Sequence, residues 1–299
     1  MSFDLKKILK NKVINSWNLF SLISIPMCIA MIINLLSTDL NSGPGISSMI
    51  QYSVRWAVPF IYLVVAASSL HILFPSSFSS WLLINRKYIG LCFAVAMAWQ
   101  GLFIFIMSYF FHDYYYADVY FLRDELEGSI GYIFLPAMVI TSFHFGRKYL
   151  SSKQWTLLHK SGVYFLWAYP FSVYWWNLSY YEDPGVIDYL FYWAGFTAFA
   201  LRVAAWGKKN KIHNHGDSSM IIRICGGLFI GVGLLMSVTS LYWQEYITSF
   251  LTATNWSANL ELWIPFWPFE PYLSLVFIAF GTMLYIKPRY KSELESFLN

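Results

Sequence analysis

The sequence predicts an all-α fold: a polytopic membrane helix bundle with about eight transmembrane helices. Hydrophobic residues make up 58% of the 299-residue chain and charged residues only 12%, about half the charged share of soluble domains. Aromatic residues reach 21%, as expected for side chains at two membrane–water interfaces. Apolar segments of about 20 residues, the length that crosses a bilayer, recur throughout. We therefore expect one transmembrane domain over 1–299.

The expected helices follow one another with short connections. The first apolar segment is too long for the core of a signal peptide, so we expect it to be retained. The fourth segment is short and contains Pro136, and the sixth carries Asp188 at its start and Arg202 near its end. The prolines of WIPFWPFEP (263–271) prevent a regular helical start to the eighth. The expected segments are 15–36, 52–74, 88–111, 128–145, 156–176, 186–206, 219–241 and 265–287.

The basic residues predict the orientation of this bundle. If the N-terminus is cytoplasmic, all of the 20 Lys and Arg except Arg55 and Arg123 fall on the cytoplasmic side. The positive-inside rule therefore favours eight crossings with both termini cytoplasmic, in a cell membrane such as the bacterial inner membrane. The basic residues lie in small separate clusters, not in one stripe, which argues against nucleic-acid binding. Walker and dinucleotide-binding motifs are absent.

Three histidines are expected near the cytoplasmic ends of three different helices. His71 lies near the end of the second segment, His144 at the end of the fourth and His159 near the start of the fifth. Histidines from facing helices can hold haem iron. An imidazole cluster also suits a metal ion, a quinone headgroup or a proton relay. Alternatively, each histidine forms its own hydrogen bond at headgroup depth, independently of the others.

Two motifs resemble the ferric reductase-like transmembrane domain family. The first is RKYIGL (86–91), and the second is WTLLH (155–159), followed by Tyr164. The resemblance covers about 50–206, a ferric reductase-like core, and is closest to small bacterial members that consist of this domain alone. It implies transmembrane electron transfer through b-type haem. A separate soluble flavin-containing reductase or a quinone would act as the partner.

The chain departs from this family at the haem ligands. Gln100 and Ser172 stand where the family has histidines, and Met97 stands where related sequences carry a further one. His159 is the family histidine that remains. The resemblance therefore implies at most one haem near the cytoplasmic side, with His159 and His71 as the iron ligands and His144 as the other candidate at this depth.

Two other functional classes remain open. A membrane bundle that lost its haem ligands would serve assembly or binding without redox chemistry. A small-solute transporter is the second alternative. It would need charged groups at mid-membrane depth, and only Arg55 and Arg202 come close. Both side chains are long enough to reach the interface.

Overall fold

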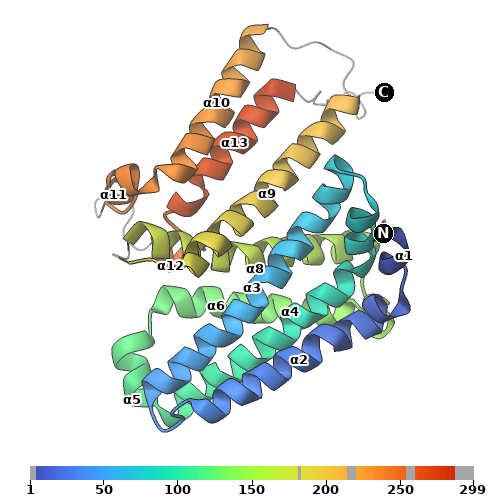
Figure 1. The fold of residues 1–299 in the computed structure, drawn as a ribbon. Helices are drawn as coiled ribbons and strands as arrows, with labels where there is room; N and C mark the ends of the chain where they lie inside the picture. The colour runs from blue at the N-terminus through green and yellow to red at the C-terminus, as the bar shows by residue number, and fades with distance from the viewer. Residues whose placement is uncertain (1–4, 181–182, 214–219, 254–259, 287–299) are drawn as a thin grey trace.

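A computed structural model describes residues 5–180, 183–213, 220–253 and 260–286, and these residues form helices joined by short connections, with no strand among them (Figure 1). The two termini, which the sequence predicts to be cytoplasmic, include residues 1–4 and 287–299, and these lie outside the described residues. The all-α prediction is confirmed for the described part of the chain.

Each of the eight predicted segments coincides with one long helix. The short helices α1 (Leu5–Leu9), η1 (Lys12–Ile14), α5 (His112–Tyr114), η2 (Tyr115–Val119), α7 (His144–Arg147), α11 (Ser240–Leu251) and α12 (Leu260–Trp263) lie between or before them. The long helices are α2 (Ser16–Ser37), α3 (Gly43–Leu73), α4 (Ser77–Phe110), α6 (Leu122–Thr141), α8 (Ser152–Tyr180), α9 (Val186–His213), α10 (Met220–Val238) and α13 (Glu270–Ile286).

Five of these helices are long and apolar enough to cross a membrane: α2, α3, α4, α9 and α10. Helix α13 is apolar but has only 17 residues. Helix α6 begins with the charged sequence LRDELE, and α8 begins with the polar sequence SKQ, which lowers the hydropathy of both. Eight crossings and the orientation of the termini therefore stay predictions.

The main boundary error lies at the start of α4, which was expected at residue 88 but begins at Ser77. Ser76 and Ser79 form a capping box, in which each hydroxyl bonds the other residue's backbone N–H. Such a cap satisfies N–H groups that a helix start leaves free. The helix therefore begins well before the apolar run, which places Arg86 and Lys87 on regular helical turns instead of in a loop.

Helix α8 occupies the middle of the bundle, where it packs against α3, α6, α9, α11 and α13. Its buried aromatic side chains include Trp167, Phe171 and Trp175. The Trp167 ring stacks on Phe171 within α8, at 4.9 Å between centroids, and on Phe199 of α9, at 4.6 Å. The indole N–H of Trp167 donates to the Gly195 carbonyl oxygen at 3.0 Å. Stacked rings and this bond fix α8 against α9.

Charged groups separate to the two ends of the bundle. Helix α1, the α3–α4 turn and the α6–α8 connection lie at one end in Figure 1, which we call the basic end. The connections 38–42 and 111–121, helix α11 and the starts of α6, α9 and α13 lie at the opposite end, called here the acidic end. Every Asp or Glu whose side chain the structure describes belongs to the acidic end.

Small residues allow α10 and α13 to pack closely. A Cβ atom on Gly233 would lie 2.6 Å from the Ser274 carbonyl oxygen, and one on Gly226 would lie 2.7 Å from the Gly281 carbonyl oxygen. Gly226 and Gly233 are buried and seven residues apart, so they face the same neighbour. Membrane helices use such small residues because van der Waals packing between backbones replaces the hydrophobic driving force.

We therefore expect Gly233→Ala to destabilise the bundle by about 1–3 kcal/mol, because its methyl group would collide with the α13 backbone. Gly231→Ala is the matched control, since no atom lies within 4 Å of its added Cβ. Thermal unfolding of both variants in the same detergent checks the prediction. Equal melting temperatures for the two variants would contradict this packing.

Candidate functional site at the basic end

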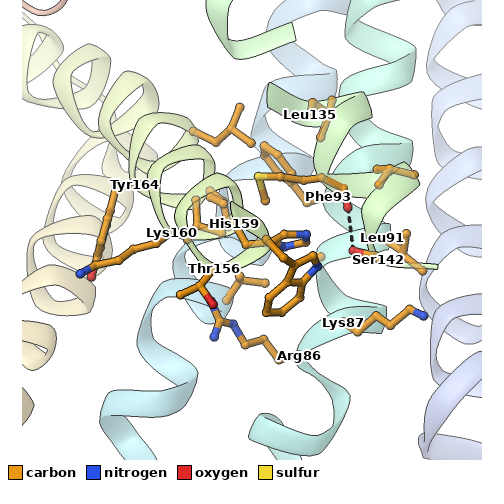
Figure 2. Close-up of a pocket in the computed structure, with 18 of the residues that line it drawn as sticks. Arg86, Lys87, Leu91, Phe93, Leu135, Ser142, Thr156, His159, Lys160 and Tyr164 are labelled. Atoms are coloured by element: carbon orange, nitrogen blue, oxygen red, sulfur yellow. Dashed lines mark hydrogen bonds between the residues drawn. The ribbon is translucent and has the colours of Figure 1, made fainter. Parts of the chain in front are cut away.

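A cavity of about 390 Å³ opens near the basic end, between α3, α4, α6, α8 and α9 (Figure 2). Its inner wall is apolar and consists of side chains that are less than a tenth exposed: Ile61, Val64, Phe93, Leu135, Val163 and Leu166. Its outer wall is polar and includes the exposed residues Lys87, Thr156 and Lys160. The cavity is therefore apolar at its inner end and cationic at its mouth.

His159 lines this cavity from the second turn of α8. Its Nε2 atom lies 3.0 Å from the Thr141 hydroxyl at the end of α6. The Trp155 ring lies 4.3 Å from the imidazole between centroids, and its indole N–H donates to the Thr141 carbonyl oxygen at 3.0 Å. His159 and Trp155 thus join the end of α6 to the start of α8.

The other two predicted site histidines do not line the cavity. His71 lies near the end of α3, with Nδ1 at 3.5 Å from the Ser80 hydroxyl. His144 begins the short helix α7 and is exposed. Within the described residues, no group of three or more His, Cys, Asp and Glu could hold a metal ion. The cavity therefore has His159 as its single imidazole, and the pairing of His159 with His71 or His144 stays a prediction.

Four cationic side chains line the cavity: Arg86, Lys87, Lys160 and Arg202. Arg202 of α9 is fully engaged within the protein. Its guanidinium donates to the Tyr164 hydroxyl from two nitrogens, at 3.0 and 2.7 Å, and to the Ser68 hydroxyl. It also lies over the Tyr164 ring, 5.4 Å from the centroid. These contacts hold Arg202 between α3, α8 and α9.

The two lysines of the cavity lie at its exposed mouth. The ammonium nitrogen of Lys87 lies 4.5 Å above the Phe143 ring, and Figure 2 shows the Lys87 side chain turned away from His159. Lys160 extends toward Tyr164 on the other side of the view. Both ammonium groups therefore add positive charge at the mouth without filling the interior.

Arg86 of α4 differs from the other three cations. Its side chain is partly buried, yet it makes no hydrogen bond, ion pair or ring contact among the described residues. Arg86 and Arg202 line the same cavity, so their like charges repel one another. The two ion pairs that the described part of the chain contains, His112–Asp113 and Arg123–Asp124, lie at the acidic end. Arg86 therefore has five N–H donors and no anionic partner.

Sequence reasoning singled out Arg86, Lys87 and His159 as parts of the two motifs, and the structure brings all three into one cavity wall. The sequence did not show that Arg86 lacks a partner among the described residues. A signal was present in the sequence, since the basic segments contain few acidic residues that could neutralise them. Comparisons with known proteins add no further information, because no family model, curated protein or solved structure matches the chain.

We expect Tyr164→Phe to lower the free energy of unfolding by about 2 kcal/mol, because it removes the oxygen that accepts two hydrogen bonds from Arg202. Tyr149→Phe is the control, since Tyr149 is 77% exposed. Unfolding of both variants in mixed micelles checks this expectation. If both variants were as stable as the unmodified chain, the Tyr164 hydroxyl would not hold Arg202.

Proposed function

We propose that this protein is an integral membrane protein that binds the anionic headgroup of an amphipathic molecule in the basic-end cavity. The observation that carries the proposal is the partly buried, unpaired guanidinium of Arg86. The function is binding without redox chemistry, and its ligand combines a phosphate or carboxylate group with an apolar chain.

The headgroup part of the proposal rests on charge. A cation removed from water costs several kcal/mol unless a counter-charge and hydrogen bonds compensate it. Arg202 donates hydrogen bonds to two hydroxyl groups, whereas Arg86 donates none within the described chain. No carboxylate lines the cavity. An anionic ligand would supply this counter-charge, and the planar guanidinium suits the paired oxygens of phosphate or carboxylate.

The tail part of the proposal rests on the apolar inner wall. Phe93, Leu135 and Leu166 are 5%, 8% and 6% exposed, and they lie on three different helices. The apolar chain of the ligand would contact these three side chains. The basic end is the end that the sequence predicts to be cytoplasmic, where anionic lipids are concentrated in many membranes. A lipid-like ligand therefore matches both parts of the cavity.

We expect Arg86→Gln to weaken binding of phosphatidylglycerol about tenfold, as the loss of one charge-assisted contact would. Lys153→Gln is the matched control, because it removes one positive charge from an exposed position of α8 outside the cavity. Native mass spectrometry of the full chain with defined lipids measures the retained lipid.

Two further compounds test which part of the ligand is recognised. Phosphatidylcholine has an apolar chain but no net negative charge, and glycerol phosphate has the anionic group without the chain. Retention of phosphatidylglycerol alone supports a ligand with both a headgroup and a chain. Equal retention of phosphatidylcholine, or equal loss in the Arg86 and Lys153 variants, would overturn the proposal. Displacement of the lipid by glycerol phosphate alone would show that the cavity recognises a free phosphate.

Electron transfer through haem is the second candidate, and the place of His159 in the cavity wall favours it. A b-type haem would supply one-electron chemistry, with a soluble flavin-containing reductase or a quinone as its partner. His159 offers one axial ligand, while the cavity-lining residues offer no second imidazole. The fit is therefore incomplete, and we derive no electron-transfer step.

Absorbance spectra of protein expressed with added haem test this second candidate. It predicts a reduced-minus-oxidised α-band that is lost in His159→Ala and retained in His144→Ala, whose imidazole is exposed. A colourless protein, or a band that both variants retain, would contradict haem ligation by His159. Lipid retention is measured on the same preparations, so that a failure of haem binding can be distinguished from a failure of headgroup binding.

A further inference from the structure

A second cavity of about 290 Å³ lies at the acidic end, between the first turns of α6, the second half of α8 and the turn at Phe266 and Trp267. We propose that this cavity binds a small organic ammonium ion. The proposal is independent of the basic-end cavity, since the two cavities share no lining residue.

The charge of the second cavity favours a cation. Its charged lining residues are Arg123, Asp124 and Glu127, with a net charge of −1 when all three are ionised. Arg123 Nε lies 3.2 Å from an Asp124 carboxylate oxygen, so these two groups neutralise one another. Glu127 is left with no ion pair among the described residues, although it is only 6% exposed. A buried carboxylate without a counter-ion is costly, so a cationic ligand would stabilise it.

The hydrogen bonds of Glu127 leave room for such a ligand. One carboxylate oxygen accepts the backbone N–H of Phe266 at 2.7 Å, and this is its single hydrogen bond within the described chain. Phe266 has a φ of 62°, a left-handed conformation that is costly for a bulky residue. Glu127 therefore holds the turn that closes the cavity and still has acceptor capacity for an ammonium N–H.

The walls of the cavity supply aromatic faces. Tyr169 and Trp176 of α8 line it together with Phe266 and Trp267. The Trp176 ring stacks on Tyr180 at 4.4 Å between centroids, and the Arg123 guanidinium lies 5.9 Å from its centre, a cation–π contact within the protein itself. The Tyr169 ring lines the cavity and makes no aromatic ring contact in the described part of the chain, so it is the ring that we expect a bound cation to contact.

The size and polarity of the site narrow the ligand class. The volume lies at the low end of ligand pockets, which favours a compact molecule. Aromatic side chains beside a carboxylate that has no ion pair among the described residues, here Glu127, recognise ammonium groups, including methylated ones. A metal ion is disfavoured, because the described residues provide no group of three suitable ligands. A compact amine or quaternary ammonium ion therefore matches the cavity.

Choline and its uncharged isostere 3,3-dimethylbutanol are the probes of this proposal. We expect the full chain in detergent to bind choline, measured by calorimetry, and to bind the neutral isostere at least tenfold more weakly. Glu127→Gln should weaken choline binding at least tenfold, because it removes the charge while its amide oxygen can still accept the Phe266 N–H. Asp113→Asn is the control, an exposed carboxylate at the same end that does not line the cavity.

Tyr169→Leu provides a second variant that leaves Glu127 in place, and we expect it also to weaken choline binding. Melting temperatures of all variants verify that they fold. Absence of choline binding to the unmodified chain, equal binding of the neutral isostere, or full binding by a folded Glu127→Gln protein would each overturn the proposal. Loss of lipid binding at the basic end would not affect these outcomes.

Discussion

The separation of charge between the two ends of the bundle is the constraint on which the rest of the account depends. No described carboxylate reaches the basic end, so each cation there must find another partner. Arg202 uses the hydroxyls of Tyr164 and Ser68, and Lys208 donates to the Ile72 carbonyl oxygen at 2.7 Å. Lys87 lies over an aromatic ring. Arg86 has none of these partners among the described residues, and an anionic ligand would compensate its charge.

Helix α8 connects the two cavities because it contributes to both walls. Its first turns supply His159, Lys160 and Tyr164 to the basic-end cavity, and its second half supplies Tyr169 and Trp176 to the acidic-end cavity. Between them, the buried Trp167 and Phe171 rings pack against α9 and α13. Helix α8 therefore contributes to both proposed sites, one for an anion at the basic end and one for a cation at the acidic end.

The sequence was sufficient to predict the helices but not the partners of their side chains. Hydropathy located all eight long helices, since apolar length is a local property. The start of α4 was misplaced because its cap depends on two serines outside the apolar run. Equal depth suggested a cluster of His71, His144 and His159, but depth does not determine which face of each helix meets a neighbour. For the same reason, the hydrogen bonds that hold Arg202 could not be predicted, and the scarcity of acidic residues near Arg86 was the one sequence signal of its unpaired state.

The most direct test of the central claim is an experimental density map of the protein extracted with its native lipids into nanodiscs. The account predicts density for a headgroup within hydrogen-bond distance of the Arg86 guanidinium, continued by chain density along Phe93, Leu135 and Leu166. A map in which Arg86 pairs with a carboxylate of the protein itself, or in which protein side chains fill the cavity, would contradict the account.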